Sequence, residues 1–288
     1  MTRPRARTLI ETVASLSALD GPSAALAKQI RAILKPGPVK DAVSGTWLGH
    51  PLHPPLTDVP IGTWTSATLL DLLGGKASRP AAQRLIGLGL LAAGPTAWSG
   101  WSEWADSETG DDHVRRVGIV HASVNGIAAA LYGASLLARR RGAHTTGVLL
   151  GLAGLGTVGT GGWLGGDLAY ARGIGVDQTA FDHGPGDWTP VLDASMLPDD
   201  RPVTAAAGDV EIVLVRRNGT IHALADRCSH RGGPLHEGTL VGDCIECPWH
   251  GSRFQLGDGS VERGPAAYPQ PVYEAREHEG RIEVRAAA

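Results

Sequence analysis

Cysteine, phenylalanine and net charge are all scarce in this chain of 288 residues, which has three cysteines, two phenylalanines and a formal net charge of −3. A small, odd number of cysteines excludes the disulfide framework that holds many short secreted domains together. A nearly balanced charge gives no electrostatic basis for binding nucleic acid. Glycine (40 residues) and tryptophan (8 residues) are in excess. The length allows about two domains.

A secretion signal is also lacking from residues 1–23. Glu11 and Asp20 interrupt any apolar core there. Pro4 and Ala6 separate the arginines that a twin-arginine signal would place side by side. We therefore expect that no folded, cofactor-loaded domain of this chain is exported.

Charged residues are nearly absent from long stretches between residues 59 and 166. Four apolar segments lie there: Val59–Leu73, Leu85–Trp101, Val117–Ala138 and Thr145–Gly166. A bilayer core needs roughly 20 apolar residues per helix, which the last two segments reach, the second approaches and the first falls short of. Tryptophans fall near the segment ends, as in an aromatic belt. We expect a transmembrane four-helix bundle over residues 45–170, with a soluble bundle as the alternative.

The flanking segments have a different composition. Residues 1–44 show apolar residues at helical spacing and predict amphipathic helices that lie on a membrane or pack on the next domain. Residues 171–187 predict a linker, and residues 188–286 show short β-type runs separated by turn dipeptides. The expected fold class is therefore a multidomain α plus β chain, with a mainly α N-terminal half and an all-β C-terminal domain.

All three cysteines lie in one window, "DRCSHRGGPLHEGTLVGDCIECPWHGSRF". Its candidate ligands form two pairs, Cys228-x-His230 and Cys247-x-x-His250. Two thiolates and two imidazoles suit zinc or an iron–sulfur cluster. Cys244 is left over, and we expect it to be a small packed residue in a strand.

The two stretches "CSHRGGPL" and "CPWHGSRF" resemble the ligand boxes of the Rieske family, and the resemblance extends over about residues 187–286. It implies a [2Fe–2S] cluster with Cys228 and Cys247 on one iron and His230 and His250 on the other. It also implies a cluster surround to which seven residues contribute: Gly233, Pro234, Pro248, Trp249, Gly251, Ser252 and Pro265.

The sequence differs from one branch of the Rieske family at two positions of the ligand boxes. Members in respiratory bc complexes carry one more cysteine in each box, and the two are joined as a disulfide. Gly233 and Trp249 stand at those positions here, so that disulfide is excluded. The sequence therefore resembles the ferredoxin-type Rieske proteins, whose potentials tend toward the low end of the family range.

The stretch "WLGHPLHPPLTDVPIG" resembles a bacterial family of four-helix membrane domains of unknown function, with a His-Pro-Leu-His-Pro box. That resemblance covers roughly residues 45–170 and implies no activity. Polar residues inside a membrane are costly and are functional candidates by default. Those candidates are His50, His53, Asp71, His121 and Asn125. They predict either a haem or quinone site or interhelical hydrogen bonds, and we favour the hydrogen bonds.

Together these features predict a membrane-anchored Rieske [2Fe–2S] protein that transfers one electron at a time. No mononuclear-iron triad or dinucleotide fingerprint is recognisable, so no substrate site and no enzyme activity are assigned. One alternative is a redox-sensing or auxiliary binding module tethered to a membrane enzyme. The other is a membrane oxidoreductase with haem or quinone in the bundle.

The expected partners are a reductase or oxygenase, or membrane quinone, together with the lipid bilayer. Nucleic acid is not expected. We expect a multi-pass protein of a bacterial-type cell membrane. Four spans would place both ends on one side, and clusters are assembled in the cytoplasm. We therefore expect the Rieske domain on the cytoplasmic face.

Overall fold

The computed structural model describes residues 5–287, so residues 1–4 of the predicted N-terminal segment, and residue 288, lie outside the described part. The chain forms two compact units. A helical unit comprises residues up to Leu34 together with Leu52–Ile174, and a Rieske-side unit comprises Lys35–Pro51 together with the chain from Gly175 onward. Each unit is described by itself.

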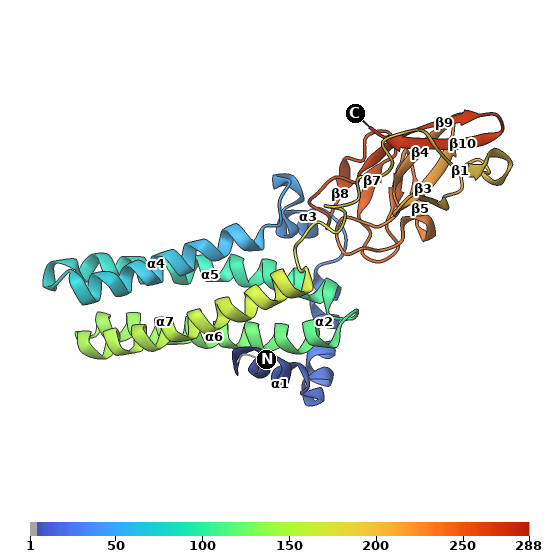
Figure 1. The fold of residues 1–288 in the computed structure, drawn as a ribbon. Coiled ribbons are helices and arrows are strands. Elements are labelled where there is room, and N and C mark those ends of the chain that lie inside the picture. Colours follow the sequence, from blue (N-terminus) through green and yellow to red (C-terminus); the bar gives the residue numbers. More distant parts are fainter. Residues whose placement is uncertain (1–4, 288) are drawn as a thin grey trace. The chain divides into compact units, whose positions relative to one another are not determined.

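Long helices make up the helical unit, in which α4 to α7 run alongside one another (Figure 1). The helices of this unit are α1 (Arg5–Ala14), α2 (Asp20–Ile33), α4 (His53–Leu73), α5 (Arg79–Ser107), α6 (Asp112–Arg140) and α7 (His144–Gly166). Asp111 caps α6, since its side chain accepts hydrogen bonds from the backbone N–H groups of His113 and Val114. After α7 the chain makes a short π-helical turn, η4 (Asp167–Ala171). The expected four-helix architecture is confirmed.

Aromatic and polar side chains fill the interior of the four long helices. Trp64 of α4 stacks on Tyr132 of α6 with ring centroids 4.3 Å apart, and its indole N–H donates to the carbonyl oxygen of Ile86. Nearby, the guanidinium of Arg139 pairs with both carboxylate oxygens of Asp71, one of them at 2.7 Å. Both side chains are almost completely buried. The two ionic groups therefore neutralise each other inside the bundle.

The helices differ in how well they suit a membrane. Within the described residues, two stretches are long and apolar enough to cross a bilayer, Asp112–Arg140 and His144–Ala171, with mean hydropathies of 1.4 and 1.3. Helices α4 and α5 do not meet that criterion, and each contains an internal proline, Pro60 and Pro95. The helical arrangement is thus clear, while its membrane character rests on two of the four helices.

The Rieske-side unit is built mainly of antiparallel strands in two sheets. The sheet orders are β1-β10-β9-β4-β3-β2 and β5-β6-β7-β8. The strands of the larger sheet are β1 (Thr189–Asp193), β2 (Val203–Ala207), β3 (Val210–Arg217), β4 (Thr220–Ala225), β9 (Val272–His278) and β10 (Arg281–Ala286). The strands of the smaller sheet are β5 (Thr239–Val241), β6 (Cys244–Glu246), β7 (Arg253–Gln255) and β8 (Val261–Arg263). The expected all-β domain is confirmed.

Alternation of side chains along β3 explains how the two sheets share one core. Ile212 and Leu214 point into a cluster with the strands of the larger sheet, whereas Val213 and Val215 point to the side that carries Ile245 and Phe254. All of these side chains are completely buried. Because successive side chains in a strand face opposite sides, a continuous apolar run such as β3 is buried on both faces.

Two segments flanking the bundle pack on the Rieske-side unit. Helix α3 (Pro38–Ser44) and the following turn belong to this unit rather than to the bundle. Residues 175–187 also pack there, since the N–H of Gln178 donates to the carbonyl oxygen of Ser229, and the hydroxyl of Tyr273 donates to that of Asp182. The sequence led us to expect boundaries at residues 44 and 171 and a linker up to 187. The structure divides the chain differently, because residues 35–51 and residues 175–187 both belong to the Rieske-side unit.

Candidate iron–sulfur centre

The first ligand box is a tight loop after β4. The N–H of Cys228 donates to the carbonyl oxygen of Gly233 at 2.9 Å, and the N–H of Gly232 donates to that of Cys228 at 2.8 Å. Gly232 has φ +74°, a left-handed conformation that glycine adopts without strain. Cys228 is 1% exposed. The loop therefore directs its thiol into the domain and brings His230 to the loop tip.

The second box is a similar loop between β6 and β7. The N–H of Cys247 donates to the carbonyl oxygen of Ser252 at 2.8 Å, and the N–H of Gly251 donates to that of Cys247 at 3.1 Å. Gly251 has φ +77°. Cys247 is 3% exposed, whereas Pro248 and Trp249 at the tip are exposed. The two boxes thus share one design, with a buried cysteine at the base and a histidine near the tip.

The two loops bring the four predicted ligands together in pairs. The thiols of Cys228 and Cys247 are in hydrogen-bonding contact, which raises the pKa of Cys228 and lowers that of Cys247. The imidazole rings of His230 and His250 lie 5.1 Å apart, centroid to centroid, at an interplanar angle of 89°. Burial lowers the pKa of His230 well below its usual value, and the charge of His250 lowers it further. The neutral imidazole is the form of histidine that binds metal.

Gly233 leaves space between the two boxes. A Cβ atom there would lie 2.8 Å from the Sγ of Cys247 and 3.0 Å from the ring of Trp249. Positions 233 and 249 therefore face each other, where members of the bc complexes carry their disulfide. In the described structure all three cysteines are free.

A third loop closes the site at Gly264–Pro265, a cis peptide bond. The N–H of Ala266 donates to the hydroxyl oxygen of Ser252 at 3.0 Å. The hydroxyl of Ser229 donates to the carbonyl oxygen of Tyr268 at 2.9 Å. Both ligand boxes are thus hydrogen-bonded to the loop that contains Pro265. Pro234 forms a β-bridge with Arg227 at the base of the first box.

Two residues in the support of this site were not found from the sequence. The side-chain oxygen of Gln270 accepts from the N–H of Ser229 at 3.0 Å, and its amide N–H group donates to the carbonyl oxygens of Ala225 and Arg227. Asp226 is buried, and its carboxylate oxygens accept hydrogen bonds from the backbone N–H and the ring Nδ1 of His236. No spacing rule marks Gln270, because its role follows from the third loop returning to the first.

Cys244 has no place in the ligand set. It is 2% exposed in β6, and its thiol donates to a carboxylate oxygen of Glu262 at 3.1 Å. Burial, followed by this carboxylate, raises the pKa of Cys244 to about 12. It therefore remains a protonated, packed thiol at neutral pH.

The donor set fits a [2Fe–2S] cluster with two cysteines on one iron and two histidines on the other. Among residues 5–287, no three His, Cys, Asp or Glu side chains gather around one point. A centre with two protein ligands per iron needs only pairs, and the structure provides a thiol pair and an imidazole pair. Both pairs lie on loops fixed by backbone hydrogen bonds, as a preorganised site requires.

The polar candidates of the helical half are not one cluster. His53 Nδ1 donates to the carbonyl oxygen of Thr96, and His121 Nδ1 donates to that of Gly161, both at 2.9 Å. Each bond joins neighbouring helices, α4 to α5 and α6 to α7. The amide N–H group of Asn125 donates to the carbonyl oxygen of His121 within α6. The two histidine contacts are thus interhelical hydrogen bonds, whereas the Asn125 contact lies within a single helix.

Two of the polar candidates, His50 and Asp71, take no part in these contacts. His50 belongs to the Rieske-side unit, where its ring meets Tyr268 edge-on at 6.3 Å. Asp71 lies in the helical half, where it pairs with Arg139 of α6 rather than with the other polar candidates.

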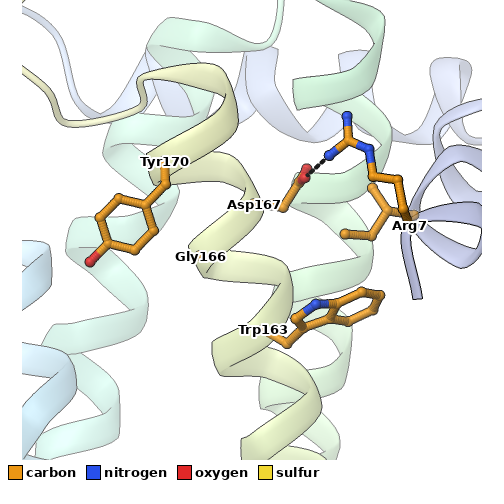
Figure 2. Close-up of a pocket in the computed structure, with 6 residues that line it drawn as sticks. Arg7, Trp163, Gly166, Asp167 and Tyr170 are labelled. Carbon is orange, nitrogen blue, oxygen red and sulfur yellow. Dashed lines mark hydrogen bonds and ion pairs between the residues drawn. The ribbon is translucent and has the colours of Figure 1, made fainter. Parts of the chain in front are cut away.

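A pocket of about 370 Å³ lies at the end of α7, lined by Arg7, Ile10, Trp163, Gly166, Asp167 and Tyr170 (Figure 2). Both carboxylate oxygens of Asp167 are already engaged, one by Arg7 and the other by His113, each at 2.7 Å. The pocket contains neither His53 nor His121. The residues that line this pocket therefore include no metal-binding partner for His53 or His121.

Comparison with known proteins finds a matching family for each half of the chain. Residues 187–274 match the family model described as "Rieske [2Fe-2S] domain", and residues 49–178 match "Predicted membrane protein (DUF2231)". The anthranilate 1,2-dioxygenase ferredoxin subunit of Burkholderia cepacia is 31% identical over 98 residues, which are 34% of this chain and 91% of that protein. Ferredoxin CarAc of Metapseudomonas resinovorans is 35% identical over 98 residues, 34% of this chain and 92% of that protein.

Two further likenesses are more limited. A solved complex of reduced oxygenase and oxidized ferredoxin in carbazole 1,9a-dioxygenase contains a chain 31% identical to this one, with a TM-score of 0.33; the match covers 35% of this chain and 96% of that one. Apoptosis-inducing factor 3 of mouse is 32% identical over 77 residues, 27% of this chain, and this chain spans only 13% of its length.

An all-β domain that pairs two cysteines and two histidines on adjacent loops defines a class of iron–sulfur protein. This chain belongs to the Rieske [2Fe–2S] family, and its Rieske domain is homologous to ferredoxin subunits of dioxygenase systems. The domain before it matches a family of predicted membrane proteins.

Proposed function

We propose that the protein is a membrane-anchored one-electron carrier, with Cys228, His230, Cys247 and His250 as the cluster ligands. The observation that carries this proposal is the convergence of the two boxes, which places the thiols in contact and the imidazoles 5.1 Å apart. A [2Fe–2S] cluster bound there would take up and release one electron at a time. The buried cysteines hold it from the domain interior, and the histidines hold it from the loop tips.

The tip of the second box is the proposed contact point for a redox partner. Trp249 is 55% exposed beside His250, and Pro248 is exposed next to it. An exposed aromatic residue next to a ligand suits a small, transient protein interface, which favours rapid exchange of partners. Two relatives are named as ferredoxins, one as a dioxygenase subunit, which supports a reductase or oxygenase as the partner class. Membrane quinone is the other candidate donor.

Membrane anchoring is supported by the exterior of the helical unit. Large apolar side chains are exposed on all four long helices: Leu69, Leu72, Leu73, Leu88, Leu91, Ile127, Leu137, Leu149 and Leu152. The interior holds polar groups beside its apolar cluster, including Thr68, Ser99, Ser135 and the Arg139–Asp71 pair. An apolar outside around a partly polar inside is stable in lipid and would aggregate in water.

The proposed orientation places the Rieske domain on the cytoplasmic face of a bacterial-type membrane. The chain leaves the Rieske-side unit after Pro51 and re-enters it at Gly175. Four spans between those points would return the chain to the face that it left. Reporter fusions at Gly142 and Ala288 test this topology, and activity of an exported reporter at Ala288 would overturn it. Protein released from membranes by alkaline carbonate would overturn anchoring itself.

Electron transfer is tested with purified full-length protein in nanodiscs. The oxidised protein is mixed either with NADH and a flavoprotein ferredoxin reductase or with decylubiquinol, and bleaching of the visible absorbance is followed. Rapid bleaching by one donor, with reoxidation by a dioxygenase component, supports the carrier. A cluster that neither donor reduces, but whose redox state alters binding to a membrane enzyme, would favour the redox-sensing alternative.

A second candidate function rests on His53 and His121, which lie within electrostatic reach of each other. Each donates its Nδ1 hydrogen to a backbone carbonyl, so the Nε2 atom of the neutral ring keeps its lone pair. Histidines anchored in this way are suited to bind a haem iron. A pyridine haemochromogen assay on purified protein decides this: absence of haem in well-expressed protein removes the proposal, and haem lost in His53→Ala but kept in His144→Ala supports it.

A further inference from the structure

Helix α3 lies far from the ligand boxes in sequence and beside them in space. It begins at Pro38 and ends at Ser44, and the next residue, Gly45, has a left-handed φ of +86°. The third loop, which starts at Gly264, is more than two hundred residues away along the chain. Both belong to the same compact unit.

Two hydrogen bonds join residues 35–51, the segment that contains α3, to the third loop. A carboxylate oxygen of Asp41 accepts from the N–H of Gly264, and the hydroxyl of Thr46 donates to the carbonyl oxygen of Ala266, both at 3.0 Å. The fit is close, because a Cβ atom at Gly264 would lie 2.1 Å from the Thr46 hydroxyl oxygen and 3.0 Å from Asp41. The glycine therefore allows the segment to approach the loop backbone directly.

Contacts extend along the whole segment. A Cβ atom at Gly251, in the second box, would lie 3.3 Å from Pro36. At the other end, the ring of His50 meets Tyr268 of the third loop. The segment thus touches both the second ligand box and the third loop, and the third loop is in turn bonded to the first box through Ser229.

Lys40 is the unusual residue of α3. It is 3% exposed, and lysine is rarely so deeply buried because its ammonium group is strongly hydrated. The pKa of His230 is lowered mainly by burial and next by the charge of His250. The charge of Lys40 is the third cause, with a larger effect than that of Arg231. The ammonium group therefore lies within electrostatic reach of a cluster ligand.

We propose that residues 35–51 are a functional part of the cluster site, in which Asp41 and Thr46 position α3 so that Lys40 stabilises the reduced cluster. The inference rests on the proposed function. Two ferric ions, two sulfides, two thiolates and two neutral imidazoles sum to zero charge. Uptake of one electron without a proton leaves a charge of −1, which a nearby buried cation favours over the neutral state. Lys40 therefore raises the reduction potential.

The test is a redox titration of the full-length protein, followed by EPR, with four variants. Lys40→Met should lower the midpoint potential, shifting the reduced-to-oxidised ratio on the order of tenfold at fixed ambient potential. Lys40→Arg keeps the charge and should keep the potential. Lys35→Met removes the same charge from an exposed position of the same segment and should have little effect, because water screens it. Thr46→Val removes the hydroxyl that donates to Ala266 without changing any charge, and it should lower the potential in the direction of Lys40→Met.

Hydrogen exchange gives a readout that needs no electron transfer. Asp41→Ala should speed exchange of the Gly264 amide at least about tenfold, since that N–H loses its acceptor. An unchanged potential in Lys40→Met, or an equal shift in Lys40→Met and Lys40→Arg, would overturn the role of the charge. If Lys40→Met does not fold, Lys40→Gln is titrated instead under the same criteria. Absence of any cluster from the unmodified protein would instead refute the proposed function.

Discussion

The two halves of this protein use histidine in opposite ways. In the Rieske domain, His230 and His250 lie at loop tips and face each other 5.1 Å apart. In the helical bundle, His53 and His121 each donate to the backbone of a neighbouring helix. We propose that the first pair binds iron, because two loops bring it together with two thiols, whereas the second pair joins neighbouring helices. The neighbours of a histidine, and not the residue type, decide its role.

The same contrast holds for buried charge. The bundle neutralises Asp71 with Arg139 inside the unit, a bidentate pair with both side chains nearly fully buried. The Rieske-side unit buries Lys40 beside ligands whose cluster would gain negative charge on reduction. The ion pair stabilises the bundle, whereas the proposed role of Lys40 is to stabilise the reduced cluster.

The largest expected effect separates the ligands from the other polar residues. Cys228→Ser or Cys247→Ser removes a thiolate ligand of the proposed cluster, so iron and acid-labile sulfide should fall to near zero and the EPR signal should vanish. Cys244→Ser is the matched control and should retain the cluster, as should His121→Ala. Iron and sulfide analysis with EPR is the measurement. A cluster that survives Cys228→Ser, or is lost in Cys244→Ser, would refute the ligand assignment.

A second experiment acts on the bundle alone. Arg139→Met leaves the Asp71 carboxylate buried without its cation and should destabilise the helical unit by about 3–5 kcal/mol. The double variant Asp71→Leu/Arg139→Met should recover most of that loss, because no ion is left unpaired. Thermal unfolding in detergent, followed by far-UV circular dichroism, measures this. Cluster absorbance at low temperature should be unchanged; coupled loss of the cluster would contradict the separate roles of the two units.

A smaller effect is expected at the contact between the boxes. Gly233→Ala places a Cβ atom 2.8 Å from the Sγ of Cys247, and such overpacking costs about 1–3 kcal/mol. The variant should lose its cluster faster than the unmodified protein in the presence of a chelator. Gly257→Ala has no atom within 4 Å of the new Cβ and serves as the control. Equal cluster lifetimes for the two variants would contradict this prediction, because they would show that the loops shift to accommodate the added Cβ atom.

The smallest expected effect is the inertness of Cys244. Burial raises its pKa to about 12, so it remains a thiol from neutral pH to well above pH 8, and its thiolate forms only as the pH approaches 12. Iodoacetamide at pH 8 should leave Cys244 unmodified in the folded protein and alkylate it in guanidinium. Peptide mass spectrometry reads both states. Alkylation of the folded protein at pH 8 would identify a mobile or reactive β6.

The sequence predicts the four proposed ligands because each cysteine lies within three residues of its histidine along the chain. Each box is a short loop, and a Cys-x-His or Cys-x-x-His pattern carries its own geometry. The apolar runs likewise predict the long helices, since periodicity is a local property. Both the Rieske domain and the preceding membrane-family domain are therefore recognisable from short local motifs.

What the sequence does not reveal are contacts between distant segments. Asp41 was placed with the N-terminal helices, because nothing near it in sequence points to Gly264. His50 was grouped with His53 because both lie in the His-Pro-Leu-His-Pro box, yet the two belong to different units. Asp71 likewise pairs with Arg139, which lies 68 residues away along the chain. Helical spacing fixes which face a residue occupies, while tertiary packing decides which side chain meets it.

The central claim is that two loops of this chain hold one [2Fe–2S] cluster through two cysteines and two histidines. Pulsed EPR of the dithionite-reduced, detergent-solubilised protein tests it most directly, with iron and sulfide counted on the same sample. The account predicts two irons and two sulfides per chain and hyperfine coupling to two histidine nitrogens that disappears on ligand substitution. A colourless protein that contains only zinc, or a cluster without nitrogen coupling, would contradict it.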